Sequence, residues 1–283
     1  MSAKDTIEIF RSAAQQNMQD PLRNGQLLHF PSAGELIVTG DLHNHRRNFD
    51  KIVKFASLKD FPERHVILQE LIHGGPLGPS GEDASLEMLL DAAQWSLQFP
   101  GQVHFLLANH DLAQILAQPI MKEGYDLTDR FNRAFSAWFG GQGPQVASAF
   151  QDFILSQPLS GITVNGIMIC HSLPGIKDMQ GFDPTILQRQ IVPADLQRNG
   201  SIFKLVWGRS QNEEVVDTLS RTWWTDLFVC GHQAQDNGYG TIGRKMLILD
   251  SAHNHGVILP LLLDRQYTID DLINTLIPIA GIA

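Results

Sequence analysis

Cysteines, basic residues and long apolar runs are all scarce in this chain. Two cysteines, Cys170 and Cys230, occur among 283 residues, which excludes a disulfide framework and favours a reducing compartment. We interpret both as small buried hydrophobic side chains. Lys and Arg number 21 against 30 Asp and Glu, so the formal net charge is −9. General binding to nucleic-acid backbones is therefore not expected, because it needs clustered Lys and Arg.

The chain has no apolar run long enough to predict a membrane-spanning segment. The stretch 257–263 is interrupted by Pro260 and is far shorter than the roughly 20 apolar residues that cross a bilayer. The first 20 residues are polar and lack the basic and apolar regions of a signal peptide. We therefore predict a cytoplasmic protein that does not associate with membranes.

Five short polar clusters recur along the chain, and each directly follows an apolar run. They are Gly40-Asp41-Leu42-His43-Asn44, Gln69-Glu70, Asn109-His110-Asp111, Cys170-His171 and Cys230-Gly231-His232. Each pattern predicts a buried strand that delivers an acid, an amide or an imidazole at its carboxyl end. Such strand ends usually meet at one ligand-binding edge of a sheet. Oxygen and nitrogen ligands without a thiolate suit a site for two metal ions.

Between these clusters the sequence predicts strands that alternate with helices. The predicted strands are 35–40, 65–68, 103–107, 161–164, 167–170, 227–230, 246–249 and 257–261. The predicted helices are 1–18, 48–58, 83–99 and 129–153. The first three strands form a β-α-β-α-β pattern that favours parallel pairing. We expect one domain over 1–283, in which 120–158 is a candidate helical insert.

The order of the five clusters resembles that of the calcineurin-like metallophosphoesterases. Gly40-Asp41-Leu42-His43-Asn44 resembles the family's first block, Gly-Asp-x-His-Gly. Asn109-His110-Asp111 resembles the Gly-Asn-His-Glu/Asp block, and His171 and Gly231-His232 resemble the two later histidine blocks. The resemblance extends over about 36–250, which is most of the chain.

This resemblance implies an α/β fold (α+β by some schemes), with a β-sandwich of two mixed sheets flanked by helices. It also implies a phosphoesterase in which two divalent cations, roughly 3.5–4 Å apart, activate water for in-line attack on phosphorus. The implied ligands are Asp41, His43 and Glu70 for the first cation, and Glu70, Asn109, His171 and His232 for the second. Manganese, or iron with zinc or manganese, matches these ligand types.

Two features resemble the protein serine/threonine phosphatase branch of the family. The block Gly231-His232-Gln233-Ala234 contains one histidine rather than a His-x-His pair, and Trp207 lies in a Trp-containing stretch before it. The implied substrate is a phosphomonoester, either a phosphoprotein or a small phosphate ester. Arg209, Arg46 and the metal ligand Asn109 are the candidate contacts to that substrate.

One block departs from the family pattern. Where the family has Gly-Asp-x-x-Asp-Arg-Gly, this chain has Gln69-Glu70-Leu71-Ile72-His73-Gly74-Gly75. Glu70 replaces the bridging aspartate, His73 replaces the second aspartate, and Gly74 replaces the phosphate-binding arginine. The loss of this arginine removes a bidentate contact to phosphate. We expect Glu70 to contact both cations from a backbone adjusted to its longer side chain.

The predicted catalytic residues are His110, Asp111 and His73. The resemblance implies that His110 donates a proton to the leaving oxygen, but its orienting carboxylate is replaced by His73. Two imidazoles do not reproduce an imidazolium-carboxylate pair, so Asp111 is a candidate substitute, and His73 is either a site residue or an ordinary loop histidine. The altered block also leaves a second interpretation open, in which a weakened enzyme fold binds a ligand or partner without catalysis.

Overall fold

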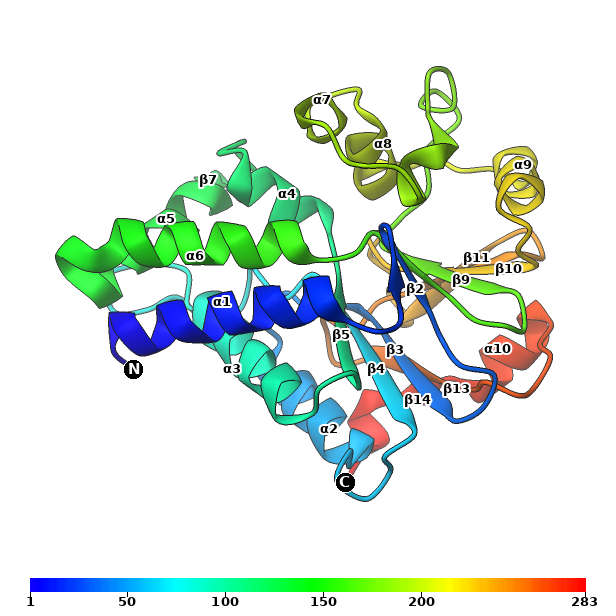
Figure 1. Cartoon of the computed structure of the whole chain (residues 1–283), viewed down its shortest axis with the longest axis horizontal. Helices are drawn as coiled ribbons and strands as arrows, with labels where there is room; N and C mark the ends of the chain where they lie inside the picture. Colours follow the sequence, from blue (N-terminus) through cyan, green and yellow to red (C-terminus); the bar gives the residue numbers. More distant parts are fainter.

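Two mixed β-sheets pack against each other in the computed structural model, which describes residues 1–283 (Figure 1). The first sheet contains, in spatial order, β1 (Arg23–Asn24), β2 (Leu27–His29), β8 (Ser160–Ile162), β9 (Ile167–Cys170), β10 (Leu227–Cys230), β12 (Met246–Leu249) and β11 (Tyr239–Ile242). The second contains β14 (Ile277–Pro278), β13 (Val257–Leu262), β3 (Glu35–Asp41), β4 (Arg64–Gln69) and β5 (Val103–Leu106). The predicted sandwich of two mixed sheets is confirmed.

Helices flank this sandwich (Figure 1). They are α1 (Ala3–Gln19), α2 (Arg46–Ala56), α3 (Ser85–Gln98), α4 (Asn109–Ile115), α5 (Leu127–Phe139), α6 (Gly143–Ser156), α7 (Pro193–Leu196), α8 (Ser201–Trp207), α9 (Glu213–Trp223) and α10 (Ile269–Thr275). A small hairpin, β6 (Met121–Lys122) and β7 (Tyr125–Asp126), precedes α5. No helix combines the length and the apolar character needed to cross a bilayer. The assignment of the whole chain to one domain with a helical insert stays a prediction.

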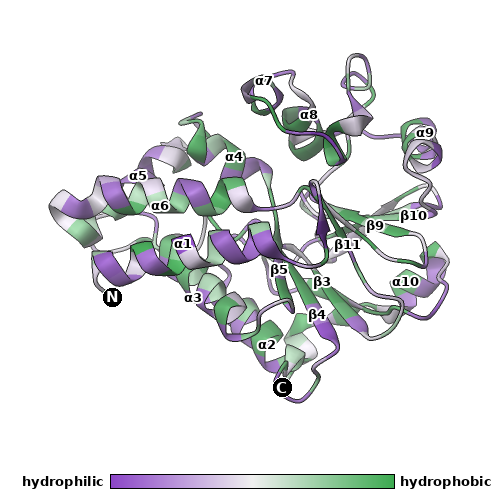
Figure 2. Ribbon diagram, viewed as in Figure 1, coloured by the Kyte–Doolittle hydropathy of each residue, from purple (hydrophilic) through white to green (hydrophobic).

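Side chains of the central strands alternate between two apolar cores. Leu36 of β3 and Ile167 of β9 belong to the core between the sheets. Their neighbours Ile37 and Met168 belong to the larger core beneath the helices. The middle parts of these strands are therefore apolar and are drawn green in Figure 2. Because both faces are buried, these strands read as continuous apolar runs, which made them predictable.

The predicted parallel pairing of the first three strands is confirmed. Val38 of β3 lies opposite Ile67 of β4, and Leu68 of β4 lies opposite Phe105 of β5. In the other sheet, β10 pairs in parallel with both β9 and β12. Parallel pairing directs the carboxyl ends of neighbouring strands to the same edge, and the polar clusters follow those ends.

The two cysteines meet across β9 and β10. Their Sγ atoms are 3.6 Å apart, and both side chains are buried. Burial raises the pKa of the Cys230 thiol well above its ordinary value. Because the thiolate is the reactive and metal-binding form, these residues act as packed apolar side chains, as predicted.

Candidate metal centre

Polar side chains converge where the carboxyl ends of β3, β4, β9 and β10 approach one another. Asp41 is the last residue of β3, Glu70 follows β4, and Asn109 opens α4 just after β5. His171 directly follows β9, and His232 follows β10 after one glycine. These five side chains are almost completely buried, whereas His43 is partly exposed. The structure therefore brings together all six residues that were predicted as metal ligands.

Glu70 lies between two groups of potential ligands. Its Oε2 is 3.4 Å from Nε2 of His43 and 3.7 Å from Nε2 of His171. Donor atoms of His43, Glu70 and His110 lie within 4.8 Å of one another, and so do those of Asp41, Glu70 and His171. Glu70 is common to both groups, as expected of a carboxylate that contacts two cations, although the structure groups Asp41 with His171 rather than with His43.

Asn109 forms the centre of the second ligand group. Its Oδ1 is 2.7 Å from Nε2 of His171 and 2.8 Å from Nδ1 of His232. The Nδ2 of Asn109 is buried without a hydrogen-bond partner. One amide oxygen and two imidazole nitrogens therefore meet at one point, as ligands of one cation do.

Backbone and amide carbonyls orient two of the histidines toward this centre. Nδ1 of His43 lies 3.0 Å from the carbonyl oxygen of Ile72, which can only accept, so Nδ1 carries the proton and Nε2 is free. Nδ1 of His171 lies 3.3 Å from Oε1 of Gln69, whose own Nε2 donates to the Thr39 carbonyl. Such partners fix the tautomer of metal-binding histidines. Nε2 of His43 and Nε2 of His171 are therefore the nitrogens left for a cation.

No lysine or arginine forms an ion pair with the buried carboxyls of Asp41 and Glu70, whose ion-pair partners are histidines. Burial raises the pKa of Asp41 well above its ordinary value, and the facing Glu70 carboxyl raises it further. Burial also raises the pKa of Glu70 to about 8 and lowers the pKa of His232 to about 3. Burying two facing carboxyls beside neutral imidazoles is costly unless a cation joins them. The residues present therefore fit divalent metal ions.

The backbone around the centre is strained. Of eleven non-glycine residues with positive φ, five surround the site, and they include His43 at 41°, Glu70 at 44° and His232 at 68°. Left-handed backbone conformations of this kind concentrate at functional sites. At Glu70 the carbonyl oxygen accepts hydrogen bonds from the backbone N–H groups of Leu42 and His43. This conformation provides the adjusted backbone that was predicted for the longer side chain of Glu70.

The resemblance described above gives Gly74 the position of a phosphate-binding arginine, and the structure shows why an arginine would not fit there. A Cβ atom at Gly74 would lie 2.3 Å from the backbone oxygen of His43. The backbone of residue 74 thus packs against the first polar cluster.

We expect Gly74→Arg to destabilise the fold by about 1–3 kcal/mol, as overpacking does, and to weaken metal binding through His43. It will not restore phosphate binding. Urea unfolding and the KM for a phosphate ester measure these effects. Gly141→Arg is the matched control, because a Cβ there meets nothing within 4 Å. A lower KM in a stable Gly74→Arg variant would show that the backbone adapts.

The three predicted catalytic residues occupy different environments. Nδ1 of His110 is 3.1 Å from Nδ1 of His73, which is buried; a role of His73 in the site stays a prediction. Oδ2 of Asp111 instead accepts from the backbone N–H of Ala108 at 3.2 Å and caps α4. Asp111 therefore has a visible structural role, and burial raises its pKa to about 7.

The two predicted arginines also differ. The guanidinium of Arg46 pairs with Asp91 and with Asp50, whose Oδ1 is 3.0 Å from Nε. Arg46 lines a surface groove between α2 and α3, so the structure does not bring it to the centre. Burial is the main cause of the raised pKa of Glu70 and the lowered pKa of His232; the positive charge of Arg209, an exposed residue just after α8, opposes the first shift and adds to the second. Arg209 is therefore the arginine near the centre.

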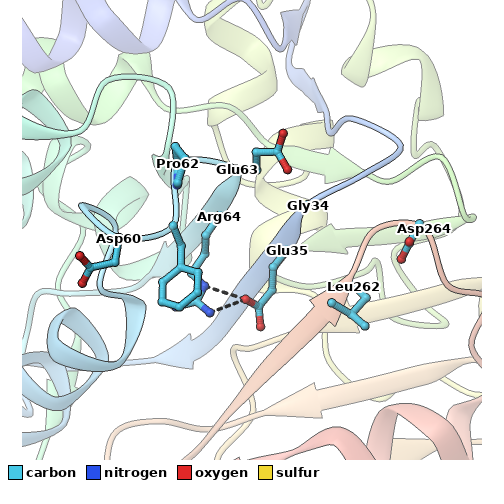
Figure 3. Close-up of a pocket in the computed structure, with 9 residues that line it drawn as sticks. Gly34, Glu35, Asp60, Pro62, Glu63, Arg64, Leu262 and Asp264 are labelled. Carbon is cyan, nitrogen blue, oxygen red and sulfur yellow. Dashed lines mark hydrogen bonds and ion pairs between the residues drawn. The ribbon is translucent and has the colours of Figure 1, made fainter.

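A separate surface cavity of about 440 Å³ lies at the opposite end of β3 and β4 (Figure 3). Nε of Arg64 donates to Oε2 of Glu35 at 2.6 Å, and the guanidinium stacks on Phe61. Asp60 and Asp264 add further acidic groups. Because its arginine is already neutralised, this cavity offers no free cation for phosphate.

Sequence reasoning missed three amides near the centre. Gln69 contacts His171, Gln114 contacts His73, and Asn132 contacts Gln114. Gln114 lies four residues after His110 on α4, and this spacing places two side chains on one helix face. That spacing was a usable signal. No local pattern indicated Asn132, which belongs to α5.

No protein-family model and no curated protein sequence matches this chain. A solved protein serine/threonine phosphatase from Saccharomyces cerevisiae, with similarity to the human phosphatase PP5, superimposes with a TM-score of 0.67 at 16% identity, covering 99% of this chain and 94% of that one. A cold-active protein-tyrosine phosphatase of a psychrophilic Shewanella species superimposes with a TM-score of 0.59 at 14% identity, covering 90% and 84%. This chain therefore has the fold of these phosphatases.

Proposed function

We propose that this chain is a metal-dependent phosphoesterase that hydrolyses phosphomonoesters with a water activated by two cations. The observation that carries the proposal is the convergence of Glu70 and Asn109 with three histidines, two of which have a ring nitrogen left free for a cation. The likeness in fold to two solved phosphatases supports the same reaction class.

Each side chain then has a defined task. Asp41, His43 and Glu70 would hold one cation, and Glu70, Asn109, His171 and His232 the other. When bound, the two cations supply positive charge for the phosphate oxygens and an acidified water for attack on phosphorus. Trp207 stacks near His110, with ring centroids 6.4 Å apart, and meets His232 edge-on at 6.2 Å. It shields the ligand histidines from solvent.

Arg209 is the proposed phosphate contact in place of the family's arginine. We expect Arg209→Ala to lower kcat/KM by about 10- to 100-fold, because a hydrogen bond to a charged group contributes roughly 1.5–3 kcal/mol. The metal content should not change. Arg46→Ala is the matched control and should alter kcat/KM by less than about twofold, since surface ion pairs contribute little. Equal losses in both variants would contradict this assignment.

Non-catalytic ligand binding is the second candidate function, and Gly74 favours it because the arginine contact is absent there. The two functions are separated by metal analysis of the purified protein, followed by assays on p-nitrophenyl phosphate and on phosphoserine and phosphotyrosine peptides with added Mn²⁺. The phosphoesterase predicts two metal ions and turnover that Asp41→Asn abolishes. Two bound metal ions without turnover on any of these esters would favour binding alone.

A further inference from the structure

A chain of hydrogen bonds leads from the candidate metal centre to the helical layer. Nδ1 of His110 lies 3.1 Å from Nδ1 of His73. Nε2 of His73 lies 2.8 Å from Oε1 of Gln114. Nε2 of Gln114 donates to Oδ1 of Asn132 at 2.8 Å. Residues of α4 and α5 thereby determine the orientation of the His110 ring, which lies beside the centre.

The amides set the direction of every bond in this chain. Because Gln114 uses its N–H to reach Asn132, its oxygen is left to accept a proton from Nε2 of His73. A neutral imidazole that donates through one nitrogen accepts through the other. Nδ1 of His73 therefore accepts from Nδ1 of His110, and Nε2 of His110 is left as a lone pair.

Packing holds both rings in these orientations. His73 is 2% exposed, its backbone N–H donates to Oγ of Ser85, and its ring meets Phe131 edge-on at 5.6 Å. The His110 ring lies against His43, with centroids 4.9 Å apart, and near Trp207. Rotation of either ring would break hydrogen bonds and displace these neighbours.

The His110 ring has potential metal ligands beside it. A ring nitrogen of His110 belongs to the group whose donor atoms, with those of His43 and Glu70, lie within 4.8 Å of one another. Because Nδ1 of His110 is hydrogen-bonded to His73, Nε2 of His110 is the nitrogen available to a cation. We propose that Asn132, Gln114 and His73 present His110 as a further ligand of the first cation. His110 is then a metal ligand rather than a proton donor. This inference rests on the proposed metal centre.

The tautomer is measured directly by heteronuclear NMR of the histidine ring nitrogens in the full-length, metal-free protein, with His110→Ala to identify the signals. We expect the ¹⁵N chemical shift of Nε2 of His110 to be that of an unprotonated nitrogen, and the chemical shift of Nδ1 to be that of a protonated one. Added Zn²⁺ should move the Nε2 signal. A proton on Nε2 in the metal-free protein would overturn the inference.

Metal affinity gives an independent readout. Calorimetric titrations measure the affinity of the first site for Mn²⁺. We expect His110→Ala to lower this affinity by at least about tenfold. Gln114→Leu should lower it by about 10- to 100-fold at most, as loss of a partner that orients a ligand does. Gln114→Glu retains an acceptor for His73 and should retain affinity. Gln157→Leu, which changes another buried glutamine, should also leave affinity unchanged.

The outcomes separate this inference from the proposed function. If wild-type protein binds two cations and His110→Ala binds both with unchanged affinity, His110 is not a ligand, although the phosphoesterase proposal survives. If wild-type protein binds no cation, the proposed function itself fails. Circular dichroism of each variant shows whether the fold persists. If His110→Ala does not fold, His110→Gln identifies the His110 signals in its place, and the tautomer in wild-type protein still decides the inference.

Discussion

Replacing Glu70 by alanine will empty both cation sites together and lower turnover of a phosphate ester by at least about 1,000-fold. A bound metal ion contributes several kcal/mol to the transition state, and each ~1.4 kcal/mol is tenfold in rate. Glu70 shares one group of donor atoms with His43 and His110 and another with Asp41 and His171. Its removal therefore takes an oxygen from both sites. Metal content by mass spectrometry and steady-state kinetics measure the two effects.

Glu35→Gln is the matched control for Glu70→Ala. Glu35 begins β3, whose other end carries Asp41, and it lines the cavity in Figure 3. This control should retain two metal ions and full turnover. If Glu70→Ala retained two metal ions at full occupancy, the proposed sharing of Glu70 would be wrong.

Removing metal will make the stability of the chain fall as the pH rises from about 7 to 8.5. Burial raises the pKa of Glu70 to about 8 and of Asp111 to about 7, and that of Asp41 well above its ordinary value. A carboxyl with a raised pKa in the folded state contributes stability below its unfolded pKa and loses it as the pH rises through the folded pKa. Two or three such carboxyls together lower the free energy of unfolding by roughly 2–4 kcal/mol between pH 7 and 8.5.

Buried histidines lower the stability of the metal-free chain at more acidic pH. Burial lowers the pKa of His73 to about 4 and of His232 to about 3. Because they stay neutral in the fold but gain protons when unfolded, they reduce stability below about pH 6.5, the ordinary histidine value. Above pH 7 they are neutral in both states, so the carboxyls dominate there.

Urea unfolding at several pH values, with a chelator or with Mn²⁺, tests this prediction. Bound cations displace the protons and keep the carboxyls ionised, so the metal-loaded protein should show almost no slope between pH 7 and 8.5. Glu70→Gln in its metal-free form should show a smaller slope than wild type, since one titrating group is gone. Metal-free wild type whose stability rose over this window would contradict the account of the buried carboxyls.

Much of the fold was predictable because the central strands are buried on both faces. Leu36 and Ile37 face different cores, so β3 reads as an apolar run that ends in Asp41. The same holds for the strands before Glu70 and His171. The strands β1, β2 and β14 were not predicted, because they have only two or three residues, and β11 was not predicted because it carries no apolar run.

The candidate site was predictable only where a residue follows a strand end. The substrate contact proposed for Arg46 stays a prediction, and its ion pairs with Asp50 and Asp91 depend on tertiary packing at the start of α2. The close approach of Gly74 to His43 depends on how two loops meet. Asn132 reaches the site from a different helix. Such relations have no local sequence signal.

Anomalous diffraction from crystals grown with Mn²⁺ tests the central claim most directly. Two manganese peaks are predicted, one beside Asp41 and His43 and one beside Asn109 and His232, with Glu70 in contact with both. An absence of peaks at this centre, or a single peak that Glu70 does not contact, would contradict the account.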